Sequence, residues 1–406
     1  MADVEVSEPG GRHRVDWLDG VRAAAALFVV FHHSWLTVWP SFPRNIGPWW
    51  VAPLVYGHLA VAVFIVVSGF SLALAPARNG GSLKGGTRHF IRRRAWRILP
   101  TYWAALIIST LITALIIVPH LSSGTTVKGF VVHGLLLQDV VGSFAPNGAF
   151  WSIAVEWQIY FLFPLILLLG RRTRPGIAVL ITVLVVIVAE EVAGLGSPLN
   201  KIHHLSPQFL ALFALGVLAV YAGRAESAVK WRRHVGGAGV AAIVAFVVLA
   251  MLEGSTWIVD RYFWIDLLVG AGVACIMTSM FAGGFPWLRR LFAARVCVFV
   301  GLFSYSIYLL HDPLVVLLGQ DVFGPMHLSR VVTFVLMIGV GVPAIVAVCY
   351  GFHLMFEAPF LRCRGVEALR LIPFVGSVLP NRTRTADSSP GPAPVTPEVV
   401  TVPNRL

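Results

Sequence analysis

Long apolar segments separated by short polar connections dominate the chain. A helix that crosses a bilayer needs about 20 mostly apolar residues, and ten segments meet this requirement. The predicted spans are residues 20–39, 53–75, 100–119, 149–169, 176–194, 206–222, 236–252, 262–282, 297–318 and 330–356. The pattern therefore predicts an all-α fold, a polytopic membrane bundle of about ten transmembrane helices.

Three other segments complete the predicted organisation. The apolar stretch Val131–Leu137 is too short to cross a bilayer and is expected to be re-entrant or interfacial. Acidic residues before the first apolar run, with no small-residue cleavage site after it, favour a retained first span over a signal peptide. We expect an N-terminal segment 1–17, a membrane domain 18–362, and a tail 363–406 whose Pro, Ser, Thr and Gly content predicts disorder from about residue 380.

Composition agrees with a membrane protein. Apolar residues make up 57% of the chain and charged residues only 12%, about half the usual share of a soluble protein. The net charge of +12 does not indicate a nucleic-acid partner, because the basic residues lie in short connections, as expected for contact with a lipid bilayer. One alternating set of connections holds 26 of the 31 Lys and Arg residues, so the positive-inside rule predicts that both termini are cytoplasmic.

No metal site is expected from the histidines and cysteines. The histidines show no HxxxH spacing, and no two cysteines form a CxxC pair. The four cysteines, most of them within or beside apolar runs, are predicted to be small buried residues: Cys275, Cys297, Cys349 and Cys363.

The first span carries ionisable residues, which cost roughly 2.5–3.5 kcal/mol each inside a membrane. Arg22 and His33 are eleven residues apart, so they project from one helix face, about 16 Å apart along the axis. Asp19 lies one turn before Arg22 and is placed to pair with it. His32 points about 100° away from this stripe.

Two interpretations of this stripe are open. In the functional one, His33 is a catalytic base or nucleophile inside the bundle, and Arg22 anchors an anionic group nearer the cytoplasm. In the structural one, His33 hydrogen-bonds to another helix and Arg22 extends its guanidinium to the membrane surface.

A group of arginines precedes the third span. Arg94 and Arg97 are three residues apart and share a helix face, with Arg93 beside them. Guanidinium binds phosphate through two parallel hydrogen bonds, which suits a cytoplasmic phosphate site. Arginines next to a membrane also set topology and contact anionic lipids, so this alternative is open too.

Other spans contain polar residues at helical spacing. Ser152, Glu156 and Tyr160 recur every four residues in the fourth span. Hydrogen bonds between membrane helices explain such residues without any catalytic role. The further candidates are Ser68, Trp151, Tyr305, Tyr308, His311 and Glu357.

Together these stretches resemble acyltransferase family 3, the integral-membrane O-acyltransferases of bacteria. The residues that carry the resemblance are Leu18–Arg22 with His33, Phe64–Phe70, Arg94–Pro100, Trp151–Glu156, Phe303–His311 and Glu357–Pro359. Six motifs in the family's order, between about residues 14 and 362, make the signal specific. The chain departs from the pattern at Trp157, where the family often has a second acidic residue.

The resemblance implies transfer of an acyl group, commonly acetyl, from cytoplasmic acyl-CoA to a hydroxyl of a sugar-containing acceptor at the cell inner (plasma) membrane. Acceptors of the family include surface polysaccharides, glycolipids and glycosylated natural products. The family pattern assigns the catalytic positions to His33, Arg22 and Glu357. The family's RxxR pattern falls on Arg94 and Arg97, and together with Arg93 these residues are expected to bind acyl-CoA. Other expected pocket residues are Asp19, Ser68, Trp151, Ser152, Glu156, Tyr305, Tyr308 and His311.

A multi-pass transporter or flippase of a lipid-linked sugar is the alternative function. It explains ten spans and intramembrane charges equally well. It predicts no dependence on acyl-CoA and no special use of the helix face that carries His33.

Overall fold

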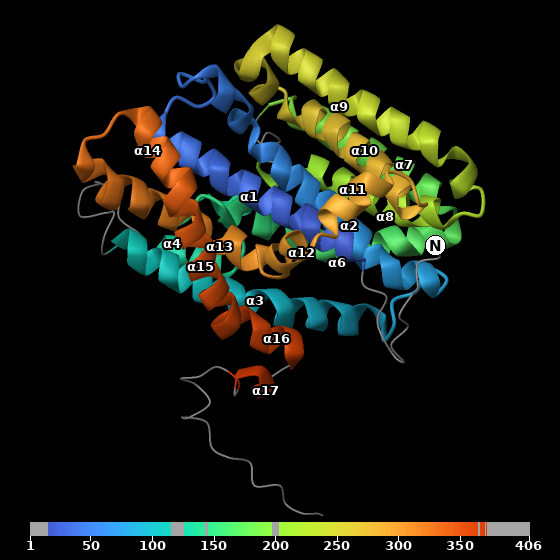
Figure 1. Ribbon diagram of the computed structural model, residues 1–406. Coiled ribbons are helices and arrows are strands. Elements are labelled where there is room, and N and C mark those ends of the chain that lie inside the picture. The colour runs from blue at the N-terminus through green and yellow to red at the C-terminus, as the bar shows by residue number, and fades with distance from the viewer. Residues whose placement is uncertain are drawn as a thin grey trace, which may run out of the picture.

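The computed structural model describes residues 15–114, 126–142, 145–196, 203–363, 366–369 and 371. All regular structure in these residues is helical, and the long helices pack side by side in one bundle (Figure 1). The predicted tail from about residue 380 and most of the segment 1–17 lie outside the described residues. The long helices are α1 (Asp16–Val38), α2 (His58–Arg78), α3 (Gly86–Ile112), α6 (Phe150–Arg172), α7 (Pro175–Ala193), α8 (Gln208–Arg224), α9 (Ala228–Val259) and α10 (Tyr262–Phe281).

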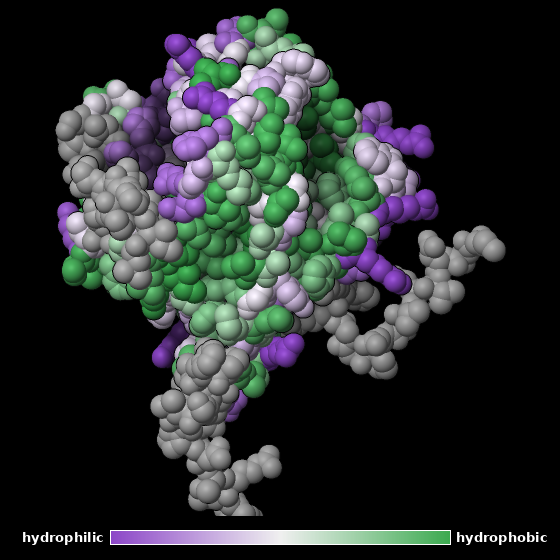
Figure 2. Space-filling view, turned by 60° about the vertical axis from the view of Figure 1, so that its left-hand side comes forward, coloured by the Kyte–Doolittle hydropathy of each residue, from purple (hydrophilic) through white to green (hydrophobic). Residues whose placement is uncertain are grey.

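The predicted membrane bundle is confirmed. In the described part of the chain, nine helices are long and apolar enough to cross a bilayer, and a bent helix pair raises the number to as many as ten. Leu and Val side chains of α7 and α9 are exposed on the outside of the bundle, as expected where helices face lipid. Figure 2 shows this broad apolar surface, with polar residues gathered toward its edges. The orientation of the termini remains a prediction.

Two spans differ from their predicted form. α3 begins at Gly86 rather than near residue 100, so the arginine group is helical and continuous with the span; its predicted end at residue 119 lies outside the described residues. The ninth span is broken after Leu302 into α12 (Arg295–Leu302) and α13 (Ser304–Leu317), with a bend of 71°. The Ser304 hydroxyl donates to the Gly301 carbonyl across this break, at 2.9 Å.

The tenth span is a chain of helical pieces, α14 (Arg330–Leu336), α15 (Val342–Phe352) and α16 (Ala358–Arg362). Two π-helical turns, η7 (Met337–Gly341) and η8 (His353–Glu357), join them. Such turns are rare and occur often at functional sites. The second of them carries Glu357 and is held to α3, because Thr101 donates to the Phe356 carbonyl at 2.9 Å.

Short helices fill the connections. They are η1 (Trp49–Tyr56), α4 (Val127–Gly134), α5 (Gln138–Val141), α11 (Pro286–Phe292), η5 (Leu318–Phe323), η6 (Gly324–Met326) and α17 (Val366–Leu369). The stretch 131–137 falls at the end of α4 and in the link to α5, and it does not form a span. Tyr102 and Trp103 of α3 donate to the carbonyls of His133 and Gly134, which hold this segment against α3.

Glycines allow the central helices to approach closely. A Cβ at Gly69 of α2 would lie 2.1 Å from the Phe213 carbonyl of α8, and one at Gly301 of α12 would lie 2.0 Å from the Asp19 carbonyl of α1. Both separations are far below van der Waals contact, so only glycine fits at these crossings. The close contacts bring α2 against α8 and α12 against α1.

Candidate functional site

α1 presents Arg22 and His33 toward the interior, as its spacing predicts. The Arg22 guanidinium donates to the Asp19 carboxylate at 2.7 Å and to the Ser71 hydroxyl of α2 at 2.6 Å. The expected Asp19–Arg22 pair is therefore present, and Arg22 is tied to the bundle rather than extended toward the membrane surface. The Arg22 guanidinium also lies within electrostatic range of Arg97 and Glu156.

His33 pairs with Asp312 of α13, a residue that the sequence did not single out as part of the site. The distance from His33 Nδ1 to Asp312 Oδ1 is 2.9 Å, and both side chains are about four-fifths buried. A carboxylate only accepts hydrogen bonds, so with a neutral ring the proton is on Nδ1 and the lone pair is on Nε2. No residue in the described part of the chain hydrogen-bonds to that Nε2.

Asp312 is held on its other oxygen by backbone. The Gly148 N–H donates to Asp312 Oδ2 at 2.6 Å. The neighbouring Asn147 side chain fixes this turn, since its amide donates to the Leu309 carbonyl of α13 at 2.7 Å and its carbonyl accepts from the Ala149 N–H. The turn before α6 thus sets the position of the carboxylate that orients His33.

Three predicted pocket residues line the same region. The His311 ring lies edge-to-face with His33 at 4.8 Å between centroids. His311 is fully buried; its Nδ1 bonds the Tyr308 carbonyl at 2.8 Å, and its Nε2 is unpartnered. The Tyr308 and Ser152 hydroxyls are 2.6 Å apart. His32, by contrast, turns to the Leu54 carbonyl of η1, at 2.7 Å.

A second group surrounds Glu156 in the first half of α6, beside the middle of α2. We call the end of the bundle where α2, α6, α8 and α10 finish and α3 begins the arginine-rich end. Ser68 and Tyr160 both donate to Glu156 Oε1, each at 2.5 Å. Arg94 lies over the Phe90 ring at 5.7 Å and within electrostatic range of Glu156 and Arg97. The arginines of α3 thus share one region with Arg22 and Glu156.

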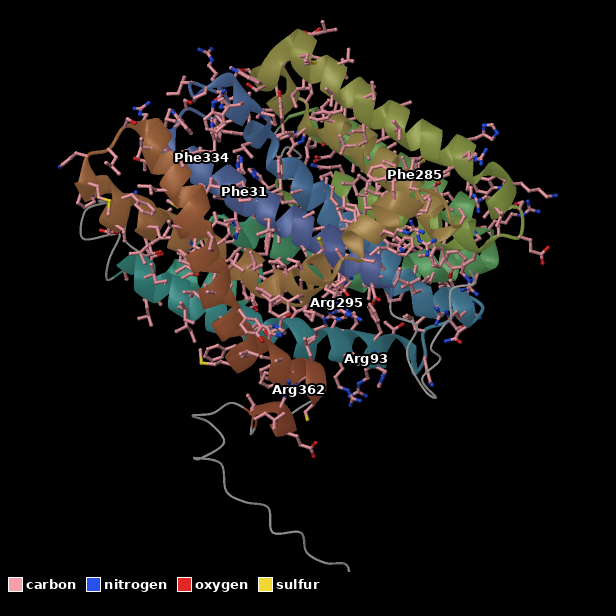
Figure 3. All side chains as sticks on the ribbon, viewed as in Figure 1. Phe31, Arg93, Phe285, Arg295, Phe334 and Arg362 are labelled. Carbon is pink, nitrogen blue, oxygen red and sulfur yellow. The ribbon has the colours of Figure 1, made fainter. Side chains whose placement is uncertain are left out.

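Labelled arginines of three elements mark the arginine-rich end in Figure 3: Arg93 of α3, Arg295 of α12 and Arg362 of α16. Phe31 and Phe334 mark the opposite end.

Glu357 belongs to a third, separate group. It accepts from Ser306 at 2.6 Å and is 2.8 Å from His353 Nδ1, and it is almost fully buried. Tyr305 lies within electrostatic range of both Glu357 and Glu156, and its hydroxyl donates to the Ile98 carbonyl of α3. The structure does not bring Glu357 into contact with His33 or Arg22.

Trp151 is directed to yet another cluster. Its ring is parallel to the His58 imidazole, with centroids 5.6 Å apart, and Tyr262 stacks at 4.1 Å. His58 Nε2 lies 2.9 Å from Asp266 Oδ2, which also accepts from Gln208. Trp151 therefore supports a second histidine–carboxylate pair and not the His33 pair.

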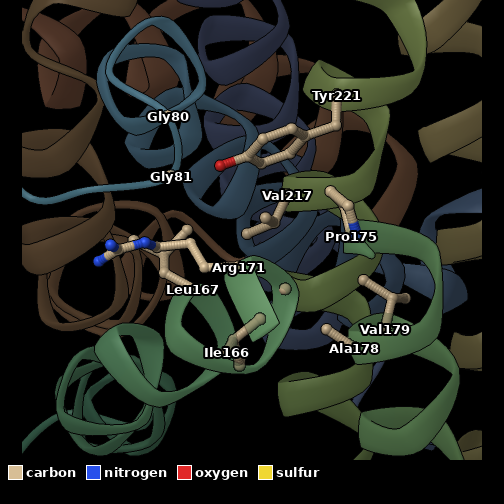
Figure 4. A pocket seen from close by; sticks show the side chains of 11 residues that line it. Gly80, Gly81, Ile166, Leu167, Arg171, Pro175, Ala178, Val179, Val217 and Tyr221 are labelled. Carbon is tan, nitrogen blue, oxygen red and sulfur yellow. The ribbon is translucent and has the colours of Figure 1, made fainter. Parts of the chain in front are cut away.

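Two cavities lie at the arginine-rich end. A largely apolar one of about 190 Å³ lies between α6, α7 and α8, with Arg171 and Tyr221 on either side (Figure 4). A larger cleft of about 910 Å³ lies beside the start of α1. No predicted site residue lines either cavity. Within the described residues, no three His, Cys, Asp or Glu side chains are grouped so that they could hold a metal ion.

A family model described as an acyltransferase domain matches residues 15–354. The chain belongs to acyltransferase family 3. With its many apolar helices, it is a multi-pass membrane protein of this family. No solved structure matches the chain significantly.

Two named bacterial proteins are similar to the chain at low identity. A Bacillus subtilis protein named "Putative peptidoglycan O-acetyltransferase YrhL" is 26% identical over 80% of this chain and 53% of its own length. A Streptomyces mycarofaciens protein named "Acyltransferase MdmB" is 28% identical over 73% of this chain and 78% of its own. The chain thus spans about half the length of the Bacillus relative.

Proposed function

We propose that this protein is a membrane O-acyltransferase that takes its acyl group, acetyl in the simplest case, from acyl-CoA at the arginine-rich end. The acceptor is a hydroxyl of a surface polysaccharide, a glycolipid or a glycosylated natural product, and the enzyme works in the cell inner (plasma) membrane. One observation carries the proposal. His33, aligned on α1 with Arg22, has its Nδ1 held by Asp312 at 2.9 Å, which leaves Nε2 free for proton or acyl transfer.

The chemistry takes one of two forms. As a base, His33 Nε2 accepts the hydroxyl proton while the acceptor oxygen attacks the thioester carbonyl; the C–S bond breaks, and the leaving thiolate takes that proton. As a nucleophile, Nε2 attacks the thioester carbonyl, the C–S bond breaks, and coenzyme A leaves as a thiolate. The acceptor oxygen then attacks the acyl carbon, the C–N bond to the imidazole breaks, and the hydroxyl proton passes to the thiolate. In both forms Asp312 stabilises the charged ring.

The neighbours of His33 support handling of a hydroxyl. His311 Nε2 is a buried lone pair without a donor, in the wall beside the His33 ring. An acceptor hydroxyl is a donor of the kind that this atom lacks, so we assign His311 to holding the acceptor. The apolar bundle around these rings protects the thioester from water.

We infer the binding site for the acyl donor, acyl-CoA, from the positive charge of the α3 arginines. Arg97 lies within electrostatic range of both Arg22 and Arg94, and Arg93, Arg94 and Arg97 supply guanidinium groups for the phosphates of acyl-CoA. Glu357 is assigned a positioning role. It binds Ser306 at 2.6 Å, and Ser306 belongs to α13, the helix that carries Asp312.

The proposal is tested by following the transfer of a labelled acetyl group from acetyl-CoA to an acceptor. Membranes that contain the protein are incubated with labelled acetyl-CoA, and carbohydrate and lipid fractions are analysed by mass spectrometry. We expect acyl label on a sugar hydroxyl that depends on His33. A transporter of lipid-linked sugars would instead change sugar distribution without any need for acyl-CoA, and that outcome would refute the proposal.

A further inference from the structure

The cleft beside the start of α1 is unusual in its charge. Its wall includes Arg78, Arg224, Arg289 and Arg290, and a single carboxylate, Asp16. The other wall residues are apolar, Trp17 and Phe281 among them. Four guanidinium groups that face one hollow of about 910 Å³ repel one another unless an anion lies between them.

Helix ends account for part of this arrangement. Arg78 lies in the last turn of α2, Arg224 in that of α8, and Arg289 and Arg290 in that of α11. Cations at helix C-termini are stabilised by the carbonyl dipoles. That effect explains each arginine singly, but it does not explain why three helix ends direct their arginines to one cleft.

The nearby Arg232 shows what a purely structural arginine does here. Its guanidinium donates to the Ala282 carbonyl at the end of α10, at 3.1 Å. Within the described residues, none of the four cleft arginines makes such a hydrogen bond or an ion pair, and all four are exposed. Their donors are therefore available to a ligand.

One face of α2 carries both an arginine of the cleft and a residue that contacts Arg22. Arg78 follows Ser71 by seven residues on α2, so both lie on one face of that helix, about 10 Å apart along the axis. Ser71 accepts from Arg22 at 2.6 Å, and Arg22 shares the α1 stripe with His33. Arg78 of the cleft and Ser71, the partner of Arg22, thus lie on the same face of α2.

We propose that this cleft is a binding site for an organic anion with two or more phosphate groups. Guanidinium pairs with phosphate through two hydrogen bonds, and several arginines around one hollow suit several phosphates. Two sources carry that chemistry, the nucleotide end of coenzyme A and an anionic lipid head group. The first interpretation rests on the proposed function, whereas the affinity for phosphate does not.

The experiment uses the full-length protein in nanodiscs of phosphatidylcholine, with adenosine 3′,5′-bisphosphate as probe in isothermal titration calorimetry. We compare the variants Arg78→Gln/Arg289→Gln and Arg224→Gln/Arg290→Gln with the control Arg172→Gln, an exposed arginine at the same end and outside the cleft. A second arm adds cardiolipin, an anionic lipid whose head group carries two phosphates, and native mass spectrometry counts the retained lipid. Thermal unfolding checks that each variant folds.

We expect the affinity for the nucleotide to fall about tenfold for each guanidinium removed, and the control to bind normally. Retention of cardiolipin by the unmodified protein and its loss in the double variants, without nucleotide binding, would also support the site, with a lipid as its ligand. Unchanged binding of both probes in both double variants would overturn the inference. A His33→Ala variant should bind the nucleotide normally, so failure of acyl transfer and failure of the cleft are distinguishable.

Discussion

Two histidine–carboxylate pairs in this bundle have the same length and different surroundings. His33–Asp312 and His58–Asp266 are both 2.9 Å long, and each histidine side chain is 20% exposed. The His58 ring is enclosed between Trp151 and Tyr262, and Asp266 is fully buried. The His33 ring keeps one nitrogen free of protein partners, beside the unpartnered His311 Nε2.

The difference teaches that a short histidine–carboxylate contact alone does not indicate catalysis. In the His58 pair, aromatic rings cover the imidazole and the carboxylate is shared with Gln208, an arrangement that holds four helices together. In the His33 pair, backbone fixes the carboxylate and leaves the outer ring nitrogen accessible. We therefore expect the two pairs to respond oppositely to substitution.

Replacement of His33 should have the largest effect. His33→Ala removes the group that takes up the proton or the acyl group, so kcat should fall by about 10²–10⁴-fold, the usual contribution of such a group. Turnover of labelled acetyl-CoA by purified protein measures this. The control is His32→Ala, because the His32 side chain hydrogen-bonds to the Leu54 carbonyl and not to Asp312. Near-normal turnover by His33→Ala would remove it from the reaction.

The variant Asp312→Asn should have the second-largest effect on kcat. An amide at this position no longer stabilises a charged ring and can present an N–H where Nδ1 requires an acceptor, so we expect kcat to fall roughly a hundredfold. The protein should still fold, because Asn is the same size as Asp and its oxygen can accept from the Gly148 N–H. Steady-state kinetics together with thermal unfolding separate the two effects. A loss of stability with unchanged kcat would show that His33–Asp312, like His58–Asp266, has a structural role and no catalytic one.

His58→Phe should give the reverse result. The ring stacking with Trp151 and Tyr262 is kept, while Asp266 loses a donor, which costs about 1–3 kcal/mol of stability. We expect a lower unfolding temperature and a kcat within about threefold of normal. The double variant His58→Phe/Asp266→Leu should recover stability, since an apolar pair can replace a buried ion pair. A large fall in kcat for a stably folded His58→Phe would contradict this comparison.

Arg94→Gln/Arg97→Gln tests the donor end. The apparent KM for acyl-CoA should rise about tenfold with a smaller change in kcat, as expected when a charge-assisted contact to the donor is lost. Arg172→Gln is again the matched control. An unchanged KM would mean that Arg94 and Arg97 do not bind acyl-CoA and instead set membrane topology.

The smallest effect is expected for Gly148→Ala. A Cβ at this position would lie 3.3 Å from Asp312 Oδ2, a tight contact that shifts the carboxylate slightly. We expect kcat to fall about threefold, because small misplacements of catalytic groups are costly. The same substitution at Gly176, which has open space around it, is the control. Equal kcat values for the two variants would show that the turn does not position Asp312.

Much of the fold could be predicted because membrane spans depend on local apolar runs. Helical spacing also placed Arg22 and His33 on one face of α1 and paired Arg22 with Asp19. Contacts between helices could not be predicted in this way. Asp312 reaches His33 through the packing of α13 beyond the 71° break, and spacing within one helix carries no information about such a bend.

Two assignments show the same limit. Trp151 is adjacent to Ser152 in sequence, yet a helix turns by about 100° between neighbours, so Trp151 joins His58 while Ser152 joins Tyr308. Asn147 and Gly148 appeared in the sequence only as the residues before a motif. Their role depends on hydrogen bonds to α13, across 162 or more positions of chain.

The π-helical turn that carries Glu357 has a mechanical consequence. A π turn contains one residue more than an α turn, and such a surplus can pass along a helix without breaking it. If His353–Glu357 relaxed to α-helical bonding, Glu357 would rotate by about 100° and exchange Ser306 for other neighbours. The last span can therefore shift by one residue, and a small change in its backbone hydrogen bonds would turn the buried Glu357 carboxylate toward a different helix.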